Sequence, residues 1–425
     1  MISEERRGAL TLVFLVVLTQ AIALAFQAII KPLYSIEDFG IFEIYFRLAN
    51  FLGFLITFRY EYALYKNISH PHFSHSVIGL FFYCALSFLI ILTLTLIALK
   101  VAEIFDLAVL VEAEVFVFAC ISALFIATFR ILVIVASLRG KYLRLGMARV
   151  AKRASEGGAQ TLLASYFGGL GLLLGEILGN LIFFIVSRDR DKSNDLRFRT
   201  IATRSVRQRG FKAFKSLREV SSDFPRKKLP ADLLDLFTDS IPVIVMAMHF
   251  ELLVIGFYEL TSKILVAPAA LFATSLSPLI FRFAAKLDTT RSEFALALLK
   301  LFVLFLVIAM LFSVCVVFGG EFIIVELFGE TWRPVAAYML ILLPGLMAQF
   351  VVSPFGEVLT LVDQVRVDFY WKMFRCLAIS SLFLFDFDAA KDLLLHYSAL
   401  TVFVFIVYLA VIVVVVGKHR KENRS

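Results

Sequence analysis

The chain has 425 residues, of which 60% are hydrophobic and 18% are charged, and its formal net charge is +8. A water-soluble fold of this length has no core large enough for so many apolar side chains, so the composition excludes a soluble enzyme or binding module. It predicts an all-α polytopic membrane protein. The four cysteines fall within apolar runs and have no disulfide or metal-ligand spacing, so we expect them to be structural.

Apolar runs long enough to cross a bilayer, about 20 residues each, recur from the N-terminus onward. The first follows the charged segment MISEERRG. This apolar run has no small-residue cleavage site, so we expect it to be retained as a span. The runs predict twelve membrane spans in two sets of six, near residues 9–30, 40–58, 76–99, 112–137, 146–166, 169–187, 231–249, 254–280, 294–318, 333–355, 369–386 and 396–416.

One long polar segment separates the two sets. Residues 188–230 contain fourteen Lys and Arg and predict a surface linker. The predicted domains are therefore an N-terminal six-helix bundle at 1–187, a basic cytoplasmic linker at 188–230, and a C-terminal six-helix bundle with a short basic tail at 231–425. Because six is an even number, the halves should share one orientation and be related by an axis along the membrane normal.

Basic residues predict which way the chain faces. The termini and the loops on their side carry 35 of the 42 Lys and Arg, whereas the opposite loops carry four. Loops rich in Lys and Arg stay in the cytoplasm. We therefore expect both termini and the linker to be cytoplasmic.

A short repeat begins the second span of each half. GIFEIYFR at 40–47 and GFYELTSK at 256–263 both place Glu three residues after Gly and a cation four residues after Glu. The cations lie ~10 Å past their glycines at 1.5 Å per residue, and exposing such a charge to lipid costs ~3 kcal/mol or more. Two interpretations stay open: Arg47 and Lys263 form local ion pairs with Glu43 and Glu259, or they line a cavity.

Arg130 is a third cation within a predicted span. It has no acidic residue within four positions and lies nine residues before Arg139. Such a charge is too deep to reach the membrane surface easily, so we expect Arg130 to line an internal cavity.

The fifth span carries a polar stripe. Arg149, Arg153, Glu156 and Gln160 follow at spacings of four, three and four residues and so share one helix face. The stripe predicts that Glu156 and Gln160 face an internal lumen, and the alternative is a helix whose first two turns protrude into the cytoplasm.

Other span residues have simpler interpretations. Asp232 is a candidate helix cap at the start of the seventh span, and Asp239 is the deepest acid on that helix. Glycines at four-residue spacing in the sixth span predict close helix packing, with Glu176 and Asn180 between helices. The histidines of HPHFSH at 70–75 lack a fourth metal ligand and are interpreted as surface residues.

The sequence contains no nucleotide-binding glycine-rich loop and no metalloprotease motif, so we expect neither an enzyme nor a pump that itself uses ATP. Several blocks instead resemble the Wzx-type flippase branch, for polysaccharide biosynthesis, of the multidrug/oligosaccharidyl-lipid/polysaccharide (MOP) exporter superfamily. The blocks that carry the resemblance are YSIEDFGIFEIYF, TFRYEYAL, LRGKYLRLGMARVAKRASEGGAQ, SSDFPRKKLPADLLDLFTDSIPVIV and IGFYELTSKILVAPAALFATSLSPLIF.

The resemblance implies two six-helix bundles that form a V around a central cavity in the bacterial inner membrane. Its expected function is to move undecaprenyl-pyrophosphate-linked oligosaccharides, such as O-antigen units, to the periplasmic leaflet. Lys263 falls where the family has a cation, and Arg59 with Glu61 match its Arg-x-Glu motif. Expected partners are the lipid-linked oligosaccharide and possible polymerase or glycosyltransferase machinery, without nucleic acid.

The expected site combines cations for the pyrophosphate with acids and amides for coupling or for a polar cavity. No cofactor is expected, and H⁺ or Na⁺ is the expected coupling ion. The alternative is a cation-coupled multidrug exporter of the same fold, which would need an acidic lumen, and a structural or lipid-scrambling component is a third class. The candidate cations are Arg47, Arg130, Lys263 and Arg153, and the candidate polar groups are Glu43, Glu259, Asp239, Glu156 and Gln160.

The charge pattern gives a direct test of topology. Alkaline phosphatase fused after Ser425 should be inactive, because this enzyme matures only after export and the C-terminus is predicted to be cytoplasmic. Periplasmic phosphatase activity from that fusion would reject the twelve-span arrangement.

Overall fold

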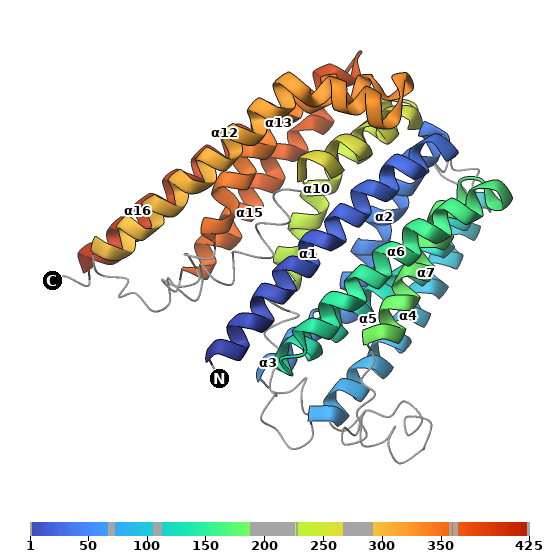
Figure 1. The fold of residues 1–425 in the computed structure, drawn as a ribbon, viewed down its shortest axis with the longest axis horizontal. Coiled ribbons are helices and arrows are strands. Elements are labelled where there is room, and N and C mark those ends of the chain that lie inside the picture. Colours follow the sequence, from blue (N-terminus) through green and yellow to red (C-terminus); the bar gives the residue numbers. More distant parts are fainter. Residues whose placement is uncertain are drawn as a thin grey trace. The chain divides into compact units, whose positions relative to one another are not determined.

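A computed structural model describes residues 2–66, 73–104, 113–187, 226, 228–266, 292–356, 359 and 364–422 (Figure 1). Within these ranges the regular structure is helical, with no strand. The chain divides into two compact units, Met1–Leu233 and Leu234–Ser425. The predicted linker lies outside the described residues as far as residue 225.

Long helices make up each unit. The first contains α1 (Ile2–Ile30), α2 (Ile36–Thr57), α3 (Ala63–Lys66), α4 (Phe73–Ile104), α5 (Ala113–Leu138), α6 (Tyr142–Phe167) and α7 (Leu170–Ser187). Helix α10 (Leu229–His249) begins in the last residues of the first unit and continues into the second. The second unit also contains helical residues 252–266, α12 (Ser292–Phe328), α13 (Pro334–Val352), α15 (Val365–Ser380) and α16 (Ala390–Glu422).

Eleven of the predicted spans lie mainly on described helices, the span predicted at 254–280 is described and helical only as far as residue 266, and the membrane fold class is confirmed. Eight helices in the described parts of the chain are long and apolar enough to cross a membrane. Helices α6, α10 and α15 are not among them, because they are shorter or carry several charges, and only residues 252–266 of the next predicted span are described. Span ends were predicted less well: α12 and α16 have 37 and 33 residues, whereas α15 has only 16.

The two ends of α2 are defined by different local structures. At its start, the Ser35 side chain accepts from the Asp38 amide at 3.1 Å, and Asp38 accepts from the Ser35 amide at 3.0 Å, which is a capping box. At its end, Phe58 and Arg59 both have positive φ, 46° and 61°. Two consecutive residues without glycine's freedom are in the left-handed region there, at a cost of ~1 kcal/mol or more each. The turn fixes where the Arg59 side chain points.

Glycines bring α6 close to its neighbours in the first unit. A Cβ at Gly157 would overlap the ring of Phe26 on α1, and a Cβ at Gly179 on α7 would lie 2.8 Å from the Cβ of Glu156. Small residues at such positions let helix backbones approach closely. The polar face of α6 is therefore packed against α7.

Helix α13 packs against α12 and α16 in the second unit. Gly345 on α13 lies against Ser398 on α16, whose hydroxyl accepts from the Gly345 amide at 3.3 Å. The buried ring of Trp332 contacts Phe257 edge to face, with ring centroids 5.9 Å apart. Aromatic packing thus joins the helix at 252–266 to the start of α13.

The close approach of α1 and α6 can be tested with adjacent glycines. Gly157→Leu should destabilise the detergent-solubilised protein by ~1–3 kcal/mol, because a larger side chain overpacks this contact. Gly158→Leu is the matched control, since nothing lies within 4 Å of a Cβ built there. Equal thermal unfolding temperatures for the two variants would contradict the packing.

Candidate functional site

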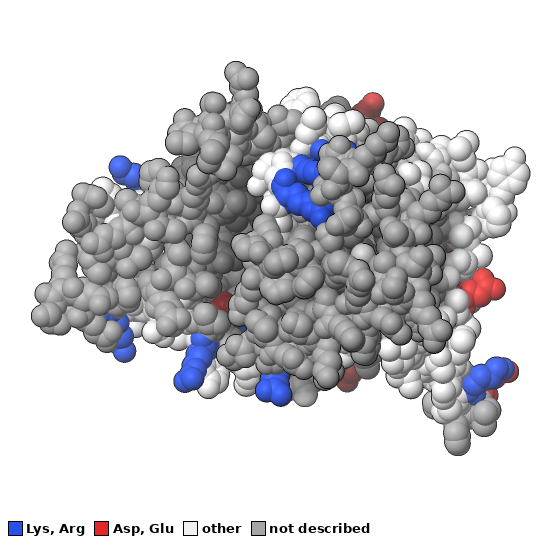
Figure 2. Space-filling model, turned by 90° about the horizontal axis from the view of Figure 1, so that it is seen from below, with Lys and Arg blue, Asp and Glu red and all other residues white. Residues whose placement is uncertain are grey.

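Charged side chains are found both on the surface and within the helix bundles. Figure 2 shows one face on which the described Lys and Arg (blue) and Asp and Glu (red) occur in several separate places. Buried charges are fewer and nearly all contact an opposite charge. Apart from Lys31, which lies over the Phe39 ring, they form the groups described below, each within one unit.

Both copies of the repeat form the local ion pair. On α2, Arg47 Nη2 lies 2.7 Å from Glu43 Oε1, and on residues 252–266 Lys263 pairs with Glu259. In each pair the acid is the more buried partner. The Glu43 and Arg47 side chains are 9% and 20% exposed, and those of Glu259 and Lys263 are 0% and 35% exposed. In each pair the cation is therefore the more exposed of the two charges.

A second group lies where α2 ends and α10 begins. Arg59 Nε donates to Asp232 Oδ2 at 2.7 Å, and its Nη1 donates to Glu61 Oε1 at 3.1 Å. Lys228 Nζ lies 3.7 Å from Asp232 Oδ1. Asp232, which the sequence suggested as a helix cap, thus serves as an ion-pair partner for the end of α2.

Arg130 on α5 joins this group through an aromatic ring. Its guanidinium carbon lies 3.5 Å from the centre of the Phe54 ring, and that of Arg59 lies 3.8 Å from the same centre. Such cation–π contacts stabilise a desolvated guanidinium by roughly 2 kcal/mol. Among the described residues, Arg130 has no carboxylate partner, and its buried Nη1 has no hydrogen-bond acceptor.

The predicted polar stripe of α6 packs mainly against α7. Arg153 Nη1 donates to Glu156 Oε1 at 2.9 Å, and Gln160 Nε2 donates to the Leu172 carbonyl at 2.9 Å. Glu156 and Gln160 are buried. Their side chains thus fill the space left by the glycines of α7, which differs from the open lumen lining that the stripe suggested.

Glu176 forms the centre of a buried polar network in the first unit. It accepts from the Tyr45 hydroxyl at 2.9 Å, from the Ser122 hydroxyl at 2.7 Å and from the Asn180 amide at 2.5 Å. Lys152 Nζ contacts Asn180 Oδ1 at 2.5 Å and lies 3.9 Å from Glu176. The network joins α2, α5, α6 and α7, as expected for interhelical hydrogen bonds.

The second unit contains a group of charged side chains on α10 and α15, of which only Asp239 was predicted as a site residue. Lys372 Nζ on α15 lies 2.8 Å from Asp235 Oδ2 and 3.5 Å from Asp368 Oδ2. Arg375 pairs with Asp239 and lies 3.4 Å from Asp235. Neither cation was predicted as a site residue, although both fall within the predicted span 369–386. Their spacing from Asp368, i,i+4 and i,i+7, is the signal that places them on one helix face.

In this group the acid is more exposed than the cation, which is the reverse of the repeat pairs. The Asp239 side chain is 47% exposed and that of Arg375 is 9% exposed. An acid is thus the outer partner here, whereas a cation is the outer partner in both repeats.

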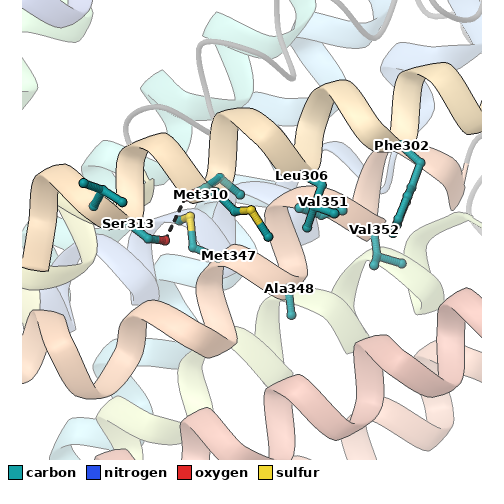
Figure 3. A pocket seen from close by; sticks show the side chains of 10 residues that line it. Phe302, Leu306, Met310, Ser313, Met347, Ala348, Val351 and Val352 are labelled. Carbon is teal, nitrogen blue, oxygen red and sulfur yellow. Dashed lines mark hydrogen bonds between the residues drawn. The ribbon is translucent and has the colours of Figure 1, made fainter.

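An apolar groove of about 540 Å³ runs between α12 and α13 (Figure 3). The Ser313 hydroxyl is turned back to the Ala309 carbonyl at 2.8 Å. The lining therefore offers contact with hydrocarbon but no charge for a head group. The labelled side chains are Phe302, Leu306, Met310, Ser313, Met347, Ala348, Val351 and Val352.

The described residues contain no group of three or more His, Cys, Asp or Glu that could hold a metal ion. His70 and His72 lie outside the described residues. The four cysteines, Cys84, Cys120, Cys315 and Cys376, are free thiols.

Comparisons with known proteins identify the fold. No family model matches the sequence, and neither does any curated protein. Among solved structures, the lipid II flippase MurJ in an inward closed conformation matches with a TM-score of 0.68 and 14% identity over 97% of this chain and 89% of that one.

Two further structures agree. An inward-facing multidrug resistance MATE family transporter of the MOP superfamily matches with a TM-score of 0.62 and 13% identity over 97% of this chain and 95% of that one. A MOP superfamily transporter from Pyrococcus furiosus, described as having reversed polarity in its binding pocket, matches with a TM-score of 0.61 and 14% identity over 98% and 97%. The chain is thus a multi-pass membrane protein with the fold of the MOP superfamily transporters.

Proposed function

We propose that the protein is a flippase of the bacterial inner membrane that moves lipid-linked oligosaccharides, carried on undecaprenyl pyrophosphate, by alternating access. The observation that carries the proposal is the outward position of the cation in both repeat pairs, Glu43 with Arg47 and Glu259 with Lys263. The fold likeness to a lipid II flippase supports the same class.

The chemistry of such a substrate explains the use of these cations. A pyrophosphate linkage carries negative charge that cannot enter hydrocarbon alone, and charge-assisted hydrogen bonds from Arg or Lys offset its lost hydration. An anion that approaches either pair meets the cation first, since the acid is buried beneath it. The polyprenyl tail stays in the bilayer while the head group moves.

A second candidate is an exporter of organic cations. The observation that favours it is the exposed Asp239 beside buried Arg375, since an exposed carboxylate attracts positive charge. The fold likeness to MATE transporters is compatible with this candidate. The flippase is preferred because its favoured charge order occurs at equivalent positions of both repeats.

Protons are the proposed coupling ions, with Na⁺ as the alternative. Protonating Glu43 or Glu259 would release its cation to bind pyrophosphate, and deprotonation would let the carboxylate compete with the ligand. Proton binding and ligand binding are then linked by one reciprocal free energy.

The first experiment replaces the repeat cations. Arg47→Gln and Lys263→Gln should each lower surface polysaccharide about tenfold or more in a strain that lacks its own flippase, because each variant loses a charged hydrogen-bond donor worth ~1.5–3 kcal/mol. Arg47→Lys should retain more activity than Arg47→Gln.

The control for loss of an ion pair is Lys100→Gln, which removes the exposed contact of Lys100 with Glu103 at 2.6 Å. Normal polysaccharide in the Arg47 and Lys263 variants would argue against the flippase. Loss of drug tolerance in Asp239→Asn, with polysaccharide unchanged, would favour the cation exporter.

The second experiment addresses coupling. In vesicles, a pH gradient should accelerate wild-type transport, whereas Glu43→Gln and Glu259→Gln should transport at rates that ignore the gradient, because neither amide can take up a proton. Transport is followed with a fluorescent lipid-linked saccharide. Wild-type transport that is insensitive to the gradient, with variants that behave alike, would remove both acids from coupling.

A further inference from the structure

The group around Arg59 carries more positive than negative charge. Among the described residues it brings together three cations, Arg59, Arg130 and Lys228, and two carboxylates, Glu61 and Asp232. Both carboxylates are already engaged by Arg59 or Lys228. The described residues of the group therefore carry one more positive than negative charge, and Arg130 is the cation that has no carboxylate in ion-pair contact. A partly buried guanidinium without an ion-pair partner is costly, so such a group favours an anion.

Two buried atoms in the group also have unmet hydrogen bonds. Arg130 Nη1 is a donor without an acceptor, and Glu61 Oε2 is an acceptor without a donor. Water molecules would satisfy both hydrogen bonds but would add no negative charge to the group. A ligand that satisfies all three needs must offer an anionic oxygen to Arg130 and a hydroxyl proton to Glu61.

We propose that this group, which we call the α2-end site, binds a phosphorylated sugar. A phosphoryl oxygen would accept from Arg130, and a neighbouring sugar hydroxyl would donate to Glu61. The charges of the group support the binding of an anion. The identification of this anion as the sugar phosphate of a lipid-linked substrate rests on the proposed function.

Local structure supports a binding role for the α2-end site. Phe54 supports both guanidinium groups, and the left-handed residues Phe58 and Arg59 hold the turn in a costly conformation. Backbone strain of this kind is concentrated at functional sites. Lys228 marks the access, because its side chain is 45% exposed and its 3.7 Å contact with Asp232 is the longest ion pair of the group.

The α2-end site is separate from the repeat pair on the same helix. Phe54 follows Arg47 by seven residues, or ~10 Å along the helix axis. Arg59 lies beyond the end of the span, on the side that the charge pattern predicts to be cytoplasmic. A substrate made in the cytoplasm would therefore meet the α2-end site first, as a loading site before the repeat pairs.

The test uses the full-length protein in detergent and three probes: glucose 1-phosphate, inorganic phosphate and glucose. Calorimetry should show glucose 1-phosphate binding most tightly, inorganic phosphate more weakly, and glucose not at all. Arg130→Gln should weaken both phosphates about tenfold or more, as expected for a lost charged hydrogen bond. Glu61→Gln should reduce the preference for glucose 1-phosphate over phosphate.

The matched control is Arg333→Gln, which removes an exposed arginine from an ion pair with Glu330 in the other unit. Its binding should equal that of the wild type. Undiminished binding by Arg130→Gln, equal affinity for the two phosphates, or equal loss in Arg333→Gln would each overturn the proposal.

A measurement on wild-type protein covers the case in which a variant fails to fold. Glucose 1-phosphate should slow chemical acetylation of Lys228 and leave that of exposed Lys100 unchanged, and no protection of Lys228 would contradict the site. Failure of the proposed function gives a different result. In that case transport survives the loss of Arg47 and Lys263, while the α2-end site still binds phosphate normally.

Discussion

Charge inside a membrane must be compensated, and this constraint explains most of the polar structure of the protein. An uncompensated Arg or Lys within a span costs several kcal/mol, so nearly every described cation at that depth contacts an acid or an aromatic ring. The repeat pairs, the network at Glu176 and the group at Lys372 satisfy the constraint in three different ways. Arg130 satisfies it only through the Phe54 ring, which is why it gives the clearest indication of a ligand.

Packing and charge compensation support each other. The glycines of α7 let α6 approach closely enough for Gln160 to bond the Leu172 carbonyl. Without that approach, the polar face of α6 would have to be exposed to water or lipid. Close packing thus converts a stripe of polar residues, which alone suggests a lumen, into an interhelical contact.

The sequence predicted helices and ion pairs within one helix, but not contacts between residues far apart in the chain. Hydropathy predicted most of the spans, because most are continuous apolar runs, and eight described helices are long and apolar enough to cross a membrane. The i,i+4 spacing predicted the alternative of paired Glu43 and Arg47. Contacts between distant residues leave no such pattern. Arg59 meets Asp232 across 173 positions, and Arg375 meets Asp239 across 136. Arg375 was not singled out from the sequence, because its acidic partners lie on another helix.

Sequence patterns also do not predict which partner of an ion pair is the more exposed. Spacing indicates that two side chains meet, but burial decides which of them a ligand encounters. In the repeat pairs the cation is the more exposed partner, whereas in the pair of Asp239 with Arg375 it is the acid. This difference makes the sign of the more exposed charge the central quantity in the proposed function.

The most direct measurement compares two fluorescent lipids in proteoliposomes that contain the wild-type protein. One carries a saccharide on undecaprenyl pyrophosphate, and the other carries the same saccharide on an uncharged linkage. The account predicts that only the charged lipid changes leaflet faster than in protein-free vesicles, as read from quenching by a membrane-impermeant reductant. Equal acceleration of both lipids, or of neither, would contradict it.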